Sequence, residues 1–486
     1  MNLLVAELRG IKNANAQKNK RSKLRGIKPK RLNKVQRQHL KHDKSKMKLK
    51  VLSIFAATIL AIVHLQAQNV STYAGAGGVG YINGHAALAK FSGLEQMTYD
   101  KNGNLLVCDA PNHCIRRIDA KGNVSTFAGT GAPGFVDGSI AVAQFNNPLG
   151  IAVDNQNNVY VSDNLNFVIR KIDTQGNVTT YAGNGEQGYE DGDGITAKFG
   201  YLNYMCFDDA QNLYVADPNN NVIRKIDAQQ NVTTFVGSGK AALIDGKGTF
   251  ADLSFPIAIA YDKYNHVFYI SDQGNSAIRK ALPDGTLSTY AGTGIIGHVD
   301  GEALSAKFYF PKGLTTDQNG NIYVAGRFDY TVRKIDTYGR VSTVAGIPHV
   351  SGNSNGESTT AKFGKPIEVV ISPDGNLLVS DWINSTIRKI ELPVTASTGI
   401  VYKNEIETKV MPNPVTTSAI IKINGTIGKE PISFVMYDVT GKEVNVKNTI
   451  SGLQIIVERG DLSSGTYFFK LVQNSKVIGM DKLIIE

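Results

Sequence analysis

Four residues in the second half of the chain have side chains that suit a ligand site. Arg327, Phe328 and Tyr330 follow one short apolar stretch, and Trp382, the only tryptophan, follows a similar stretch further on. Aromatic rings beside a guanidinium can bind a sugar ring, a peptide or an aromatic ligand. We therefore name these four residues as ligand-binding candidates, with ordinary variation of loop sequence as the alternative explanation.

Six polar residues form a second candidate group, because each lies near the start of a predicted strand. If these strands surround a channel, their side chains meet at its mouth and could hold a small ligand or a divalent cation such as calcium. A mouth filled only by hydrated polar side chains is the simpler explanation. The channel-mouth candidates are Glu95, Gln96, Asn203, Tyr204, Lys312 and Glu368.

Catalytic and metal-binding motifs are scarce. The eight histidines show neither HxH nor HxxxH spacing, and there is no CxxC motif. We therefore assign no catalytic residue and no metal-ligand set, although ligands from distant segments could still meet across a ring. Cys108 and Cys114 flank one predicted hairpin loop, so a local disulfide is an open alternative to two free thiols.

The elements that must position these residues form a repeat. The segment VSTYAG at 70–75 returns in similar form at 124, 178, 232, 287 and 341, a period of about 54 residues that indicates a repeat architecture. Within residues 148–183, turn residues separate four short β-rich segments: GIAVD, NVYVSD, FVIRKID and NVTTYAG. Four antiparallel strands per unit, repeated radially, predict a β-propeller.

The first and last copies indicate how the ring closes. The third-strand segment occurs six times, from IRRI at 115 to IRKI at 387, but no VSTYAG-like segment follows the sixth. Residues 70–75 have no blade in front of them. We therefore expect residues 70–75 to pair with IRKI at 387, which would join the last blade to the first and hide two open edges.

The repeats resemble the NHL-repeat family of six-bladed β-propellers. The resemblance covers about residues 70–392 and rests on the DxxNxxIRKID spacing, the GN turn and the aromatic-Ala-Gly ending. It implies a ring-shaped interaction scaffold and, in some branches of the family, an enzyme of the lyase or lactonase type. Residues that recur in most blades, such as Asp163, Asn166 and Arg170, are explained by turn capping and structural ion pairs.

The connectivity of such blades divides the loops between two faces. The second-to-third-strand turns and the blade-to-blade links share one face, here called the link face, and the remaining turns share the other, the turn face. The links are about 20 residues long, which is long for plain connectors. We therefore expect the link face to carry the function.

The positive charge of the chain is concentrated at its beginning. Residues 1–50 hold 17 Lys and Arg against two acidic residues, whereas the rest holds 35 basic and 40 acidic groups, which argues against nucleic-acid binding. The stretch MKLKVLSIFAATILAIVHLQAQ from Met47 has the pattern of a signal peptide. We expect residues 47–67 to be that signal peptide and residues 1–46 to be absent from the mature protein; a membrane anchor and a basic arm are the alternatives.

The repeat stops near residue 392, and a linker over 393–403 leads to a strand-rich region over 404–486. The motifs MPNPV at 411, YDVTGK at 437, DLSSGTYF at 461 and KLII at 482 resemble the type A C-terminal sorting domain of the type IX (Por) secretion system. The resemblance implies passage through the Sec route, the type IX machinery as a partner, and a secreted or surface-attached product. A plain adhesive β-sandwich is the alternative.

The predicted molecule is all-β: a six-bladed propeller of four-stranded antiparallel blades over 68–392, closed by an N-terminal strand, followed by a small Ig-like β-sandwich. We expect a binding scaffold for protein or glycan, with no nucleic-acid partner and no permanent transmembrane segment after signal removal. The alternative is an extracellular lyase or lactonase (hydrolase) with a divalent metal at the central channel.

Overall fold

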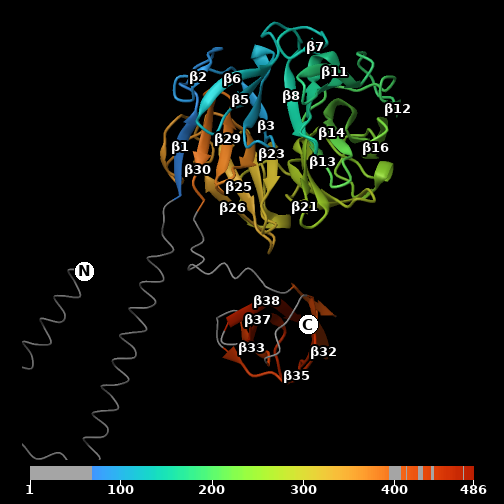
Figure 1. Cartoon of the computed structure of the whole chain (residues 1–486), viewed down its shortest axis with the longest axis vertical. Coiled ribbons are helices and arrows are strands. Elements are labelled where there is room, and N and C mark those ends of the chain that lie inside the picture. Colours follow the sequence, from blue (N-terminus) through green and yellow to red (C-terminus); the bar gives the residue numbers. More distant parts are fainter. Residues whose placement is uncertain (1–67, 393–406, 412, 425–430, 439–442, 474–475) are drawn as a thin grey trace, which may run out of the picture. The chain divides into compact units, whose positions relative to one another are not determined.

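The computed structural model describes residues 68–392, 407–411, 413–424, 431–438, 443–473 and 476–486 (Figure 1). The chain divides into two compact units, Met1–Pro393 and Val394–Glu486, which are described separately. The predicted signal peptide, its basic extension and the linker lie outside the described residues. Within the described part, no helix is long and apolar enough to cross a membrane.

The first unit is a ring of six antiparallel sheets, as the repeat predicts (Figure 1). The inner strands surround the central channel and the outer strands form the rim. From inner to outer strand, the first three blades are β3 (Leu94–Tyr99), β4 (Leu105–Asp109), β5 (Cys114–Ile118), β6 (Asn123–Ala128) and β2 (Gly84–His85); β8 (Pro148–Val153), β9 (Val159–Asp163), β10 (Val168–Ile172), β11 (Asn177–Ala182) and β7 (Gly138–Ser139); and β13 (Met205–Phe207), β14 (Leu213–Asp217), β15 (Val222–Ile226), β16 (Asn231–Val236) and β12 (Gly192–Asp193).

Blades four to six follow the same order. They are β18 (Pro256–Asp262), β19 (Val267–Asp272), β20 (Ala277–Ala281), β21 (Thr286–Ala291) and β17 (Gly246–Lys247); β23 (Pro311–Thr316), β24 (Ile322–Gly326), β25 (Thr331–Ile335), β26 (Arg340–Ala345) and β22 (Gly301–Glu302); and β28 (Pro366–Ile371), β29 (Leu377–Asp381), β30 (Thr386–Ile390), β1 (Asn69–Ala74) and β27 (Gly356–Glu357). Short 3₁₀ turns are η1 (Ala110–Asn112), η2 (Asn164–Asn166), η3 (Pro218–Asn220), η4 (Gly248–Phe250), η5 (Gln273–Asn275) and η6 (Ala303–Ser305).

Each blade has one strand more than the sequence predicts. The extra strand has two residues and belongs to the preceding link: in blade two, Gly138 pairs with Val178 and Ser139 with Asn177. It covers the beginning of the outer strand, whose backbone groups would otherwise form an open edge. The prediction missed these strands because two residues give no alternating pattern.

The N-terminal strand closes the ring, as predicted. β1 lies between β30 and β27, with Val70 opposite Ile390 on one side and Gly356 on the other. Val70 and Ala74 are buried in the cores on the two sides of blade six. The last blade is therefore held together by segments from both ends of the propeller sequence.

Each link also packs one large apolar side chain between neighbouring blades, because its repeated AxF segment points inward. Phe199, for example, is fully buried among residues of blades two and three. The equivalent residues, all buried, are Phe91, Phe145, Leu253, Phe308 and Phe363.

The second unit contains two four-stranded sheets around a shared apolar core, which agrees with the predicted β-sandwich. One sheet has the order β31-β32-β36-β35 and the other β34-β33-β37-β38. The strands are β31 (Glu407–Met411), β32 (Ser418–Asn424), β33 (Ser433–Asp438), β34 (Glu443–Val444), β35 (Asn448–Ser451), β36 (Gln454–Glu458), β37 (Gly465–Gln473) and β38 (Lys476–Ile485).

Candidate functional site

The arginines that recur in every blade belong to the scaffold. In blade two, the buried guanidinium of Arg170 donates to Asp163 and to the carbonyl oxygens of Gln144 and Val136, each at 2.9 Å. Asp163 also accepts a hydrogen bond from the backbone N–H of Asn146, at 2.6 Å. This arrangement ties the link to the blade, which confirms the structural ion pair predicted for the arginine. Asp163 makes no capping hydrogen bond to its own 3₁₀ turn, so the turn-capping role predicted for it was wrong.

Blade five builds the same junction from different residues. Gly326 replaces the usual aspartate, and Asp329 supplies a carboxylate that lies 2.8 Å from His298 Nδ1 and 3.8 Å from the Arg333 guanidinium. A Cβ at position 326 would lie 2.0 Å from Asp329 Oδ1, so the glycine makes room for this carboxylate. Asp329 and His298 therefore take the structural place of the usual aspartate in this blade.

Three of the channel-mouth candidates meet in a buried network at the start of the inner strands. The Lys312 ammonium lies 2.5 Å from Glu95 Oε2, and the Tyr204 hydroxyl donates to the same oxygen at 2.8 Å. All three side chains are buried. Burial raises the pKa of Tyr204 well above its usual value. Burial also lowers the pKa of Lys312, whereas the Glu95 charge raises the pKa of this lysine.

Gln96 and Asn203 border this network. The Gln96 side chain accepts from the backbone N–H groups of Ile151 (2.8 Å) and Met205 (3.1 Å) and donates to the Met205 carbonyl (3.0 Å), so it fastens three blades together. The Asn203 amide oxygen is buried, and no hydrogen-bond partner for it is found among the described residues. Together with Glu95, Tyr204 and Lys312, these residues fill the channel at its link-face end.

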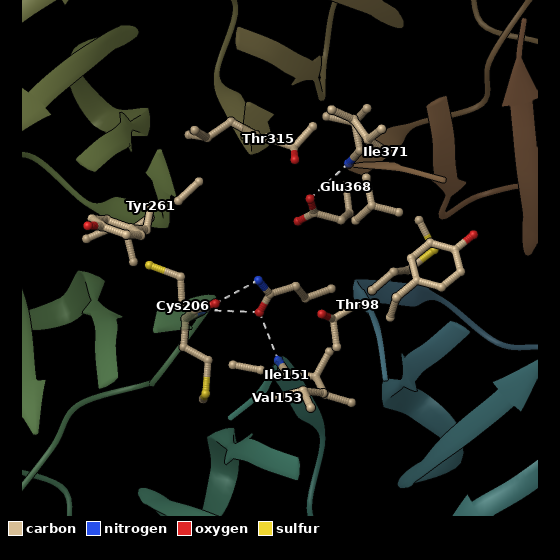
Figure 2. Close-up of a pocket in the computed structure, with 18 of the residues that line it drawn as sticks. Thr98, Ile151, Val153, Cys206, Tyr261, Thr315, Glu368 and Ile371 are labelled. Atoms are coloured by element: carbon tan, nitrogen blue, oxygen red, sulfur yellow. Dashed lines mark hydrogen bonds between the residues drawn. The ribbon is translucent and has the colours of Figure 1, made fainter. Parts of the chain in front are cut away.

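A cavity of about 450 Å³ occupies the channel on the turn-face side of this network (Figure 2). The inner strand of every blade contributes to its wall. The carboxyl of Glu368 points into it, with Thr98, Cys206 and Thr315 around the same space (Figure 2). One Glu368 oxygen accepts from the Val369 N–H at 3.0 Å, whereas the other is buried and has no partner within the described structure. The sequence placed Glu368 in the channel but did not predict this cavity.

We expect Glu368→Gln to stabilise the protein increasingly as the pH rises. Burial raises the Glu368 pKa well above 4.5, so the folded state holds this proton more tightly than the unfolded state does. The wild type therefore loses stability as the pH rises above 4.5 towards the folded-state pKa, whereas glutamine has no proton to lose. Melting temperatures between pH 5 and 8 should diverge, with the exposed Glu357→Gln as control; parallel curves would contradict the argument.

A divalent cation does not fit this network. The Glu95 carboxylate already holds an ammonium, which would repel a second cation. Burial favours the neutral form of Glu368. No group of three or more His, Cys, Asp or Glu that could hold a metal ion occurs in the described part of the chain. We therefore derive no metal chemistry from the channel.

The aromatic candidates gather on the link face around a lysine that the sequence analysis missed. Lys365 Nζ lies 4.7 Å from the centre of the Phe328 ring and 5.5 Å from that of Trp382, and the Arg327 guanidinium lies 5.0 Å from the Phe328 ring. Trp382 is 37% exposed, so its ring remains accessible. Arg327, Phe328, Lys365 and Trp382 are called the link-face cluster below.

Further aromatic rings extend this cluster. Phe310 packs on Phe328 with ring centres 5.5 Å apart, and Tyr309 lies 6.1 Å from Phe328 and 5.8 Å from His349. Tyr309 and Phe310 directly follow the repeated AxF segment of their link, at two positions where the residue type differs from blade to blade. The remaining candidate, Tyr330, occupies the left-handed turn position (φ 60°) that His113 and Phe167 occupy in other blades, and no described contact joins it to the cluster.

Of the two alternatives left open for Cys108 and Cys114, the structure shows two free thiols and no disulfide. Both cysteines are free and buried, and the strand register places Cys108 opposite Ile115 and Cys114 opposite Asp109. Burial raises the pKa of both thiols. Cys108 Sγ instead lies 3.6 Å from the Gly150 carbonyl oxygen, so these cysteines act as small apolar side chains.

A serine motif passed over in the sequence analysis also belongs to the scaffold. Residues 352–356 read GNSNG, which matches the G-x-S-x-G spacing of many hydrolase nucleophiles. That motif needs a strand-to-helix turn, but here it leads into β27. The Ser354 carbonyl and the Asn355 side chain accept from Arg388, so the segment is the sixth version of the arginine-binding link.

The fold and the recurring junctions define the first unit as a six-bladed β-propeller, and sequence-family models agree. The NHL repeat matches residues 145–171, and a beta-propeller repeat matches residues 290–327. The secretion system C-terminal sorting domain matches residues 409–486. The first unit is thus a six-bladed propeller with a match to the NHL repeat, and the match to the sorting domain indicates export by the type IX secretion system.

Similar proteins share parts of this architecture. SUPPRESSOR OF QUENCHING 1, chloroplastic, from Arabidopsis thaliana is 30% identical over 282 residues, which cover 54% of this chain and 26% of the relative. NHL repeat-containing protein 2 from Homo sapiens is 27% identical over 326 residues, which cover 59% of this chain and 45% of the relative. The chain thus spans between about a quarter and a half of these relatives.

Two solved structures from Bacteroides support the fold. A structural genomics protein of unknown function from Bacteroides thetaiotaomicron has a TM-score of 0.52 at 24% identity, and an auxiliary nutrient binding protein from Bacteroides ovatus has 0.53 at 15%. Each comparison covers 67% of this chain and 76% of the other. At these identities the likeness concerns the fold alone.

Proposed function

We propose that this chain is an exported propeller scaffold that binds a protein or glycan on its link face. The link-face cluster carries the proposal, because it combines accessible aromatic surface with two cationic side chains. Such surfaces bind amphipathic ligands through stacking and charge-assisted hydrogen bonds. The sorting domain supports a place of action outside the cell, in the medium or on the cell surface.

The scaffold itself suits this role. Each blade is fixed to its link by the same buried arginine junction, so loops that differ between blades are held on a rigid frame. Arg327 and Phe328 follow β24, the second strand of blade five, and Trp382 follows β29, the second strand of blade six. The site is therefore built by neighbouring blades at positions where their sequences depart from the repeat.

The rival role, an extracellular lyase or lactonase with a channel metal, lacks a supporting observation. The Glu95 carboxylate, which could otherwise serve as a metal ligand, is already paired with the Lys312 ammonium. The one buried carboxyl that faces the cavity, Glu368, favours its neutral form. We therefore place function at the link-face cluster.

Trp382→Ala should weaken ligand binding by about tenfold, because the variant loses a stacking surface worth about 1.4 kcal/mol. Immobilised glycans and peptides would identify a ligand for the full chain, and calorimetry would compare affinities. Tyr338→Ala removes an aromatic ring that is 78% exposed in a turn-face loop and should leave binding unchanged. Equal affinities for the wild type and Trp382→Ala would overturn the assignment of this site.

A further inference from the structure

Charge is unbalanced at the link-face end of the channel. Three cationic side chains, Lys312, Arg327 and Lys365, influence one another there: Arg327 acts electrostatically on both lysines. Glu95 is the acidic group that acts on Lys365, and it is already paired with Lys312. Neither Arg327 nor Lys365 forms a salt bridge with any described residue. Within the described structure, each of these two cations thus lacks a salt-bridge partner of its own.

The nearby aspartates already have partners. Asp329 lies against His298 and the Arg333 guanidinium. Asp381 accepts from the backbone N–H groups of Gly364 and Lys365 and lies 3.5 Å from Arg388. Neither carboxylate is free to neutralise Arg327 or the Lys365 ammonium.

The two unpaired cations are also partly removed from water. The Arg327 Nε atom is buried without a hydrogen-bond partner among the described residues. Burial lowers the pKa of Lys365, and the Arg327 charge lowers it further. Two like charges in such a place repel each other, and an anion bound near both would relieve the repulsion.

We infer that the link-face cluster binds the carboxylate of an acidic sugar, a uronic acid residue within a glycan. This rests on the proposed function and names the ligand class of the same site. Both cations lie within about 5 Å of the Phe328 ring, so charge and apolar surface are presented together. A uronic acid residue carries a carboxylate on a rigid ring whose C–H face can stack on Phe328 or Trp382. An acidic peptide offers the carboxylate on a flexible stem with little apolar face.

Polygalacturonate and its fully methyl-esterified form provide the test, because they share one sugar ring and differ in charge. The full chain should bind polygalacturonate at least about tenfold more tightly than the ester, as expected when charge-assisted hydrogen bonds are lost. Its affinity should also fall with rising salt. Arg327→Gln and Lys365→Gln should each reduce polygalacturonate binding by about tenfold and leave ester binding nearly unchanged. The matched controls Arg340→Gln and Lys121→Gln change exposed residues at the turn-face end of their blades, Arg340 as the first residue of β26 and Lys121 in a turn, and should have no effect.

The possible outcomes separate this inference from the proposed function. Equal binding of acid and ester, with loss in Trp382→Ala, would remove the acidic-sugar inference and keep the link-face glycan site. Binding of a hexaglutamate peptide through Arg327, without polygalacturonate binding, would replace the sugar by an acidic peptide. A panel in which no glycan or peptide binds would overturn both proposals.

Discussion

Val70→Asp should lower the free energy of unfolding by about 3–5 kcal/mol, because it places a charge in an apolar core. Val70 is 2% exposed and packs with Leu377 and Ile390, while its backbone holds the closing strand between β30 and β27. Loss of this strand would leave the facing edges of β30 and β27 unpaired in the sixth blade. Denaturant unfolding followed by the fluorescence of Trp382, in the same blade, measures the change.

Ser71→Asp is the matched control, because Ser71 is the next residue of the same strand and is exposed. It should change stability by less than about 0.5 kcal/mol. Equal stability of the two variants would contradict the view that β1 seals the ring. A loss confined to Val70→Asp would support it.

Arg170→Met should destabilise the propeller by a similar amount, about 3–5 kcal/mol, because breaking a buried ion pair leaves an uncompensated charge. The variant strands the Asp163 carboxylate, which is 0% exposed, and removes the donor to two carbonyl oxygens. Burial already raises the pKa of Asp163 to about 6, despite the opposing effect of Arg170. Without the guanidinium that pKa should rise further.

The neighbouring variant Lys171→Met tests whether this effect is specific. Lys171 is partly exposed, and its ammonium lies 5.6 Å from the Tyr160 ring, so its loss should cost less than about 1 kcal/mol. Adding Asp163→Asn to Arg170→Met should recover part of the lost stability, since the stranded charge is removed. Similar unfolding midpoints for the two methionine variants would refute the structural role of the arginine.

The fold could be predicted because each blade repeats the same short strands with the same turn residues. The missing outer strand after IRKI at 387 and the surplus strand at 70–75 together indicate the closure, which β1 confirms. The two-residue strands such as β7 escaped prediction because they arise from pairing with the outer strand rather than from local sequence preference.

The candidate site was predicted only in part. Arg327, Phe328 and Trp382 stand out as departures from the repeat, but Lys365 follows a glycine at the end of a link and looks like any surface lysine in the sequence. Its role depends on distances between segments that only the closed ring brings together. Tyr330 shows the opposite case. Its aromatic side chain suggested a role in ligand binding, whereas the structure places the residue at the left-handed position of a turn.

The strand Asn69–Ala74 also sets the order in which the protein can mature. It is made before every other part of the propeller, yet its partner Thr386–Ile390 is made last. A chain released from its N-terminal side therefore cannot form the sealed ring until residue 390 has emerged. Sealing of the ring is therefore a late step of propeller folding, and the facing edges of β30 and β27 stay unpaired until β1 docks between them.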